Sequence, residues 1–480
     1  MFFRKYRQDF NFFSTVIQPI EIVGHLEPLN YFEEKEKWLK SPGKTYNPQF
    51  TYSEIGIRRN LYLAKKLRHS IDGITNLYLE SADWRSILTS QLLAYQREDL
   101  DATIPFLEAI VKGKIPNPDI ADKTVGRLFG RPTQSELDVL SELTYKRSHP
   151  KDVILEHLIG ENERHIYSRT KLESIVHTFC HDFEGILTPE ENDILIHKKV
   201  TTEQAIELTQ QILAYIDEHT TCGEAHVKIN YGDKIENFGV TRNSLKASSV
   251  IFEIPSVDSG YSADYVLQTF AHELNSHLRA IVSTAELTKQ LPIHFQTILI
   301  SRNQRMLAQE GFATLNGDAV IEASQANVVE PMLVLAATYA SEGHNFAETV
   351  HFIYDTYDID PDDPNETLQS DIWTIAQFFD GIKDTSAHSG YTFPWRQVYA
   401  IGPLRTLREL CRKDENRFED PLSMMRYSEL PFPLIRNINH IEYDLREKLA
   451  PDPFEQWDFA NPNPDTLDIT GYTKQLLLDL

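Results

Sequence analysis

The stretch HELNSH, residues 272–277, places two histidines and a glutamate within six residues. Zinc hydrolases present two histidines four residues apart on one helix face, in the pattern H-E-x-x-H. His272 and His277 are five residues apart, which separates them by about 140° around an ideal α-helix. A π-bulge, or unwinding at Asn275 and Ser276, would bring them together, because such bulges are frequent at functional sites and these side chains can bond freed backbone groups. The spacing therefore predicts a distorted metal-binding helix.

The residues around this stretch predict a helix that follows a strand. Ser262 is a plausible N-cap, and the hydrophobic residues after it recur at helical spacing. These residues form one apolar stripe: Tyr265, Phe270, Leu274, Leu278 and Ile281.

Two strands are predicted before this helix. In HVKINYG, 226–232, apolar and polar residues alternate, and SSVIFEIP, 248–255, is a short β-branched run that ends at a proline. We expect a small sheet packed beside the metal-binding helix, with either strand as an edge that could bind an extended peptide.

Most of the remaining chain has helical periodicity, so the predicted fold class is α+β and mainly helical. Residues 51 to about 220 look helical throughout. Later helices are predicted at about 297–322, 331–342, 344–357, 366–382 and 395–412. The proposed organisation is a helical N-terminal region over 1–165, a catalytic domain over 166–420, and a proline-rich tail over 421–480 that packs on the surface.

Composition restricts the class of partner. Acidic residues number 71 against 47 basic ones, a balance that disfavours nucleic acid and anionic membrane surfaces. The three cysteines are far apart, which predicts neither disulfides nor a thiolate metal site and favours the reducing cytoplasm. No targeting segment or membrane span is expected.

A zinc hydrolase needs three protein ligands, an open position for water, and a carboxylate that takes the proton of that water. Glu273 is placed for the role of base. Glu310, in AQEGFATLNGD at 308–318, is the candidate third ligand, and Gly311 would let its helix approach the first helix closely. The alternatives are two histidines on a helix surface and a solvated glutamate near a helix bend.

The pair of motifs, HELNSH followed by QEGFA at 309–313, resembles the QEGLA-motif (DUF1704) family, which includes the microtubule-associated tyrosine carboxypeptidases of animals. The resemblance covers about residues 170–415. It implies a zincin-like (gluzincin) metallopeptidase with one zinc ion held by His272, His277 and Glu310, and with Glu273 as catalytic base.

A third segment, FPWRQVYAIG at 393–402, fits the family less well, because Trp395 and Arg396 stand where the family has lysine and aspartate. This departure puts specificity for a terminal tyrosine in doubt. Tyr399 could donate a hydrogen bond to an oxyanion, or could be a packed aromatic residue. Arg396 could bind the terminal carboxylate of a substrate, or could be solvated.

The sequence therefore predicts a zinc-dependent peptidase, with carboxypeptidase action on peptide or protein C-termini favoured by the resemblance. The alternative is a non-catalytic metal-binding protein of the same fold with a regulatory or interaction role. The complete set of His272, Glu273, His277 and Glu310 argues against that alternative.

Overall fold

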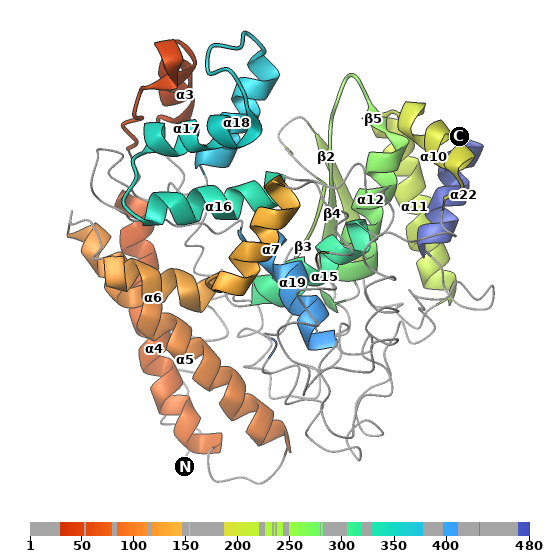
Figure 1. Cartoon of the computed structure of the whole chain (residues 1–480). Helices are drawn as coiled ribbons and strands as arrows, with labels where there is room; N and C mark the ends of the chain where they lie inside the picture. The colour runs from red at the N-terminus through yellow and green to blue at the C-terminus, as the bar shows by residue number, and fades with distance from the viewer. Residues whose placement is uncertain are drawn as a thin grey trace. The chain divides into compact units, whose positions relative to one another are not determined.

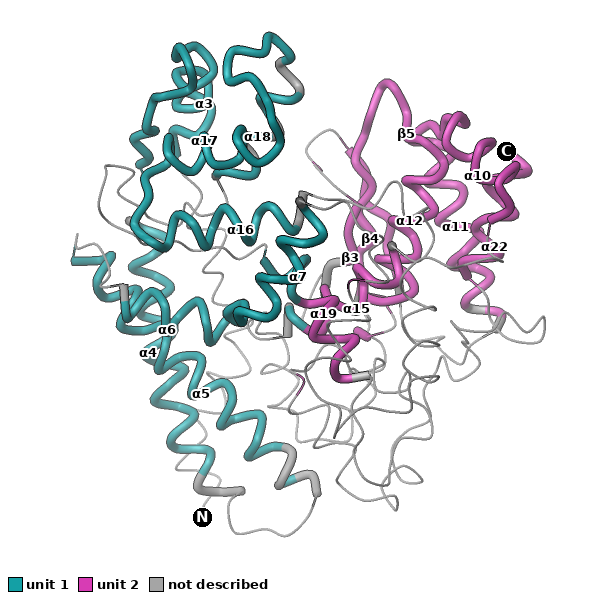
Figure 2. Tube along the Cα trace, viewed as in Figure 1, with its two compact units in different colours: residues 1–148, 300–307, 327–401 teal, residues 149–299, 308–326, 402–480 magenta. Residues whose placement is uncertain are grey.

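The computed structural model shows a chain that divides into two compact units, each made of segments distant in sequence (Figures 1 and 2). Unit 1 comprises 1–148, 300–307 and 327–401, and unit 2 comprises 149–299, 308–326 and 402–480. The domain boundaries expected near residues 165 and 420 stay predictions. The structure describes residues 29–51, 54–78, 84–112, 118–145, 153, 187–219, 226–232, 235, 238–242, 249–278, 280–281, 305–318, 329–377, 397–410, 432 and 469–480.

Unit 1 contains helices and no strand among its described residues. The long helices α4 (Glu54–Tyr78) and α5 (Trp84–Val111) pack along each other, and an aromatic cluster brings Trp38, Phe346 and Trp373 together with ring centroids 5.2–5.3 Å apart. The elements of this unit are α3 (Tyr31–Leu39), η2 (Pro42–Lys44), α4 (Glu54–Tyr78), α5 (Trp84–Val111), α6 (Pro118–Leu128), α7 (Gln134–Tyr145), α16 (Val329–Ser341), α17 (Phe346–Tyr357) and α18 (Glu366–Gln377).

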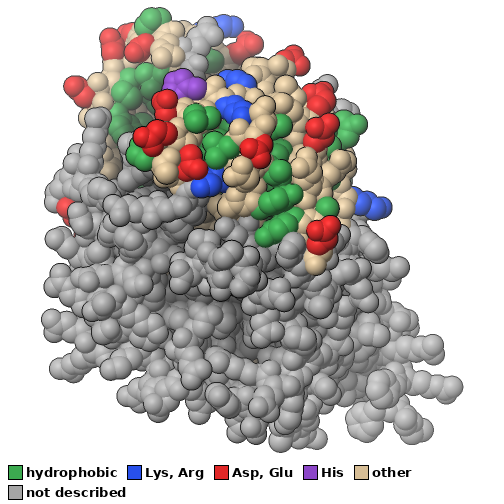
Figure 3. Space-filling view, turned by 90° about the vertical axis from the view of Figure 1, so that its right-hand side faces the viewer, with side chains coloured by type: hydrophobic (Ala, Val, Ile, Leu, Met, Phe, Trp, Pro, Cys, Tyr) green, Lys and Arg blue, Asp and Glu red, His purple; other side chains and the backbone are tan. Residues whose placement is uncertain are grey.

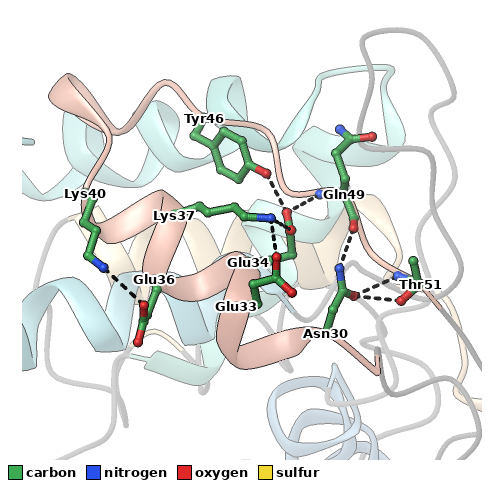
Figure 4. Close-up of polar contacts among 9 residues, drawn as sticks. All are labelled: Asn30, Glu33, Glu34, Glu36, Lys37, Lys40, Tyr46, Gln49 and Thr51. Atoms are coloured by element: carbon green, nitrogen blue, oxygen red, sulfur yellow. Dashed lines mark hydrogen bonds and ion pairs between the residues drawn. The ribbon is translucent and has the colours of Figure 1, made fainter.

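A buried carboxylate in α3 fixes the segment that follows this helix (Figure 4). Glu34 is 1% exposed and accepts hydrogen bonds from Lys37 Nζ at 2.7 Å, the Tyr46 hydroxyl at 2.7 Å and the Gln49 backbone N–H at 2.6 Å. Burial raises the pKa of Glu34, but these three donors outweigh burial and the net pKa is lowered. The ionised carboxylate therefore stabilises the fold.

Replacing Glu34 should give a pH-dependent loss of stability. Because the folded-state pKa is lowered, the stabilisation is present above the unfolded pKa of about 4.3 and is lost as the pH falls through the folded value. Glu34→Gln should cost about 1.5–3 kcal/mol near pH 7 and much less below about pH 4, as measured by denaturant unfolding across this range. Glu36→Gln, which changes an exposed carboxylate paired with Lys40, should have little effect at either pH. A loss for Glu34→Gln that is the same at pH 3 and pH 7 would contradict this assignment.

Unit 2 contains a three-stranded sheet with the strand order β2-β4-β3. Strands β2 (His226–Gly232) and β4 (Ser249–Pro255) are parallel, and β3 (Gly239–Arg242) pairs antiparallel to β4. The two predicted strands are thus confirmed, whereas β3 was not predicted. A separate two-stranded ladder joins β1 (Lys199–Val200) to β5 (Tyr261–Ser262).

Helices pack on this sheet and form the core of unit 2. Helix α11 contacts β2 and β4, and Phe270 of α12 lies edge-on against Phe252 of β4, with ring centroids 5.5 Å apart. Ser262 occupies the N-cap position of α12, as predicted, although its side chain makes no capping hydrogen bond. The helices of this unit are α10 (Pro189–His197), α11 (Thr202–His219), α12 (Ala263–His272), the π-helix η3 (Glu273–Leu278), α15 (Arg305–Asp318), α19 (Val398–Leu410) and α22 (Ile469–Asp479), of which α15 and α19 begin in unit 1.

The last residues of the chain form helix α22. The predicted surface tail over 421–480 lies largely outside the described residues, but its final part contributes to the core instead. Ile469, Thr473 and Leu477, spaced four apart, are buried on one face of α22 because this face packs against α12 and α11. No proline interrupts 469–480, but this helix was not predicted because the segment before it is rich in proline.

On the side of the chain where α10 and α22 lie, acidic side chains are spread among basic and hydrophobic ones over the described surface (Figure 3).

The described part of the chain is mainly helical with small sheets, which confirms the predicted α+β class. The expectation of helix throughout 51–220 was too broad, because β1 interrupts it. Helices α15, α17, α18 and α19 lie within the predicted ranges, and α16 begins two residues before its predicted range and ends one residue earlier. Within the described ranges, no helix combines the length and the apolar character that crossing a bilayer requires.

Candidate metal centre

The helix that carries HELNSH changes its winding at the second residue of this stretch. Helix α12 ends at His272, and the π-helix η3 continues over Glu273–Leu278, which confirms the predicted distortion. Because π-helical hydrogen bonds join residues five apart, His272 and His277 lie about one turn from each other on the same side. Their Nε2 atoms are 3.2 Å apart, and His277 is buried.

Glu310 on α15 completes a group of three possible ligands with the two histidines. Its Oε2 lies 3.6 Å from His272 Nε2 and 3.4 Å from His277 Nε2. Ligand bonds of about 2.0–2.1 Å to a tetrahedral ion place ligand atoms roughly 3.3–3.5 Å apart, close to these separations. Both nitrogen–oxygen separations exceed the 2.7–3.2 Å of ordinary hydrogen bonds, whereas the two Nε2 atoms, 3.2 Å apart, are also within hydrogen-bond distance. The triangle therefore has about the size of a metal site, with His277 buried and His272 partly exposed.

The charge state of Glu310 suits a cation. Burial raises the pKa of its carboxyl, whereas the adjacent imidazoles of His277 and His272 lower it, and the lowering is larger. A carboxylate must be ionised to act as a ligand. The described part of the chain therefore holds an N₂O donor set that could bind one metal ion.

Glu273 lies beside this group and is held by a strand. Its Oε2 accepts a hydrogen bond of 2.8 Å from the backbone N–H of Val240 in β3, and its Oε1 lies 4.0 Å from His272 Nε2. Since the Val240 N–H points to η3, this edge of β3 faces the metal group. Of the two segments expected as a possible edge strand, 226–232 (β2) lies at an edge of the described sheet, whereas 248–255 (β4) is central. The strand that contacts η3 is β3, which was not predicted.

Two of the four residues between the histidines are held by side chains of two different helices. Asn275 Nδ2 donates to Thr470 Oγ1 of α22, and Asn316 Nδ2 of α15 donates to Ser276 Oγ at 2.7 Å. We expected these side chains to bond backbone groups freed by the distortion. They instead bond side chains of other helices, which ties the π-helix to both neighbours.

Two glycines set the position of α15. A Cβ at Gly317 would lie 3.3 Å from the Cβ of His272, so this glycine allows α15 to approach α12. A Cβ at Gly311 would collide with the backbone of Gly402 and lie 2.6 Å from Thr406 Oγ1, so Gly311 faces α19. The sequence interpretation assigned the approach to the metal helix to Gly311, and this assignment was wrong. Gly317 was overlooked because an Asn-Gly pair is more typical of turns than of helix interiors.

The structure does not test the roles expected for Tyr399 and Arg396. Tyr399 lies near the start of α19 and belongs to unit 1, whereas the metal group belongs to unit 2. Arg396 lies outside the described residues. Both roles stay predictions. Sequence analysis missed Val240, Asn316 and Thr470, for which no local pattern gave a signal.

No family model matches the chain, and comparisons with curated proteins and with solved structures find no match either. The resemblance to the QEGLA-motif family thus rests on the short sequence motifs alone.

Substituting Gly311 should disturb the helix that carries Glu310. Gly311→Ala forces α15 and α19 apart, so we expect a loss of stability of about 1–3 kcal/mol and weaker metal binding. Gly239→Ala, whose added Cβ meets nothing within 4 Å, is the matched control and should keep parental stability. Thermal unfolding with and without added zinc measures both effects. Parental stability and zinc response in Gly311→Ala would show that the close approach is not required.

Proposed function

We propose that this chain is a zinc-dependent peptidase whose second unit is a zincin-like catalytic domain. The observation that supports this best is the three-atom donor set of His272, His277 and Glu310 beside the strand-bound carboxylate of Glu273. Two imidazoles and one carboxylate are typical ligands of catalytic zinc, whereas calcium and magnesium prefer oxygen ligands alone. The resemblance to the QEGLA-motif family supports the same reading.

The roles of the protein groups follow from their positions. Zinc would supply a water that is acidic enough to react at neutral pH and a Lewis acid for the scissile carbonyl. Glu273 keeps one carboxylate oxygen on the Val240 N–H, which leaves Oε1 on the side of His272. That oxygen takes the proton of the attacking water and passes it to the leaving amine.

We propose that the substrate is a peptide or protein C-terminus. Strand β3 presents a backbone edge next to Glu273, and an edge strand binds an extended peptide through main-chain hydrogen bonds, whatever its sequence. In this proposal, Arg396 binds the terminal carboxylate and Tyr399 donates to the oxyanion. Carboxypeptidase action rests on the family resemblance.

Two substitutions should separate the base from the ligands. Glu273→Gln should keep zinc and the fold but lose peptide cleavage by about 10²–10⁴-fold, because the amide cannot take a proton. His272→Ala should lose both zinc and activity. Zinc content by elemental analysis, and cleavage of a peptide library, are compared with the parent. Undiminished cleavage by Glu273→Gln would remove this residue as the base. A zinc-loaded parent that cleaves no peptide would favour the non-catalytic alternative.

A second test concerns the end of the substrate. If a terminal carboxylate is recognised, peptides with a free C-terminus should lose residues one at a time, whereas the same peptides with an amidated C-terminus should be cleaved at least tenfold more slowly. Mass spectrometry of the products measures this. Internal cleavage at the same rate in both peptides would identify an endopeptidase and overturn the carboxypeptidase assignment alone.

A further inference from the structure

The π-helix that presents both histidines depends on contacts outside its own backbone. A π-helical turn is rare, and it persists where the surroundings hold it. Asn275, at the third position of η3, is only 3% exposed. The partner of its side-chain amide is Thr470, which lies 195 residues later in helix α22.

Helix α22 is itself firmly attached to unit 2. The ring of Tyr472 stacks on Tyr215 of α11, with centroids 4.2 Å apart. Lys198 Nζ donates to the Leu478 carbonyl at 2.9 Å, which satisfies a backbone acceptor at the end of α22. A helix fixed in this way can serve as a rigid anchor for Asn275.

We infer that the C-terminal helix α22 holds η3 in the winding that presents the metal ligands, and that Thr470 is the positioning residue through which it acts. The inference rests on the proposed metal site but not on peptidase activity. Among the described residues, Asn275 Oδ1 has no hydrogen-bond partner, so losing Thr470 would leave the whole buried amide without one. Since a buried amide without partners is unfavourable, η3 would rewind or shift to bring Asn275 to other groups or to water.

The same helix offers a matched control. Thr473, one turn after Thr470, is fully buried, and its hydroxyl has no partner among the groups that the structure describes. Thr473→Val therefore makes the same chemical change on the same helix without removing a contact to η3. Thr470→Ser keeps the hydroxyl and serves as the conservative variant.

The test compares the full-length parent with Thr470→Val, Thr470→Ser and Thr473→Val. Zinc affinity is measured by competition with a chromogenic chelator. Amide hydrogen exchange over residues 273–278 is measured in the metal-free proteins. Thr470→Val should bind zinc about tenfold more weakly and exchange these amides faster, whereas both other variants should resemble the parent.

Parental affinity and exchange in Thr470→Val would overturn the inference, and so would an equal loss in Thr473→Val, which would indicate a general weakening of α22. Failure of the proposed function is distinguishable. A parent that binds zinc but cleaves no peptide leaves this inference intact. If the parent binds no zinc, the metal proposal fails, and hydrogen exchange alone decides whether α22 holds η3.

Discussion

The winding of residues 273–278 is the constraint on which the candidate site depends. Two histidines five residues apart cannot face one point from an α-helix, whereas the π-helix brings their Nε2 atoms to 3.2 Å. A third donor atom, from α15, lies at a similar distance from both. If this turn were wound as an α-helix, the three donor atoms would no longer lie close together, although the same three residues would still be present.

Several separate elements of unit 2 contact this turn and hold it in position. Helix α15 approaches closely because Gly317 lacks a side chain, and its Asn316 bonds Ser276. Helix α22 bonds Asn275 from another element. Strand β3 holds Glu273 through one backbone N–H. The turn is thus positioned by residues that come from 240 to 470 in the sequence, and none of these supports is local.

This distribution explains what the sequence could and could not predict. The spacing of His272 and His277 is a local property, so helical geometry predicted the distortion once both residues were taken as ligands of one metal. Local alternation predicted strand β2, and a β-branched run ending at a proline predicted strand β4. Strand β3 has four residues, too few to give a pattern, yet it is the strand that contacts the site. The choice between Gly311 and Gly317 depends on which helix lies opposite each residue, and one sequence does not contain that information. The partners of Asn275 and Ser276 were missed for the same reason, because both lie tens to hundreds of residues away.

We propose that His272, His277 and Glu310 together hold one metal ion on the π-helix. A crystal structure of the zinc-loaded chain, with anomalous diffraction recorded at the zinc edge, tests it most directly. We expect one anomalous peak about 2.0–2.2 Å from the two Nε2 atoms and a Glu310 carboxylate oxygen, with η3 still π-helical. The claim would be contradicted by a chain that excludes zinc from this group in excess metal, or by a peak held by other residues.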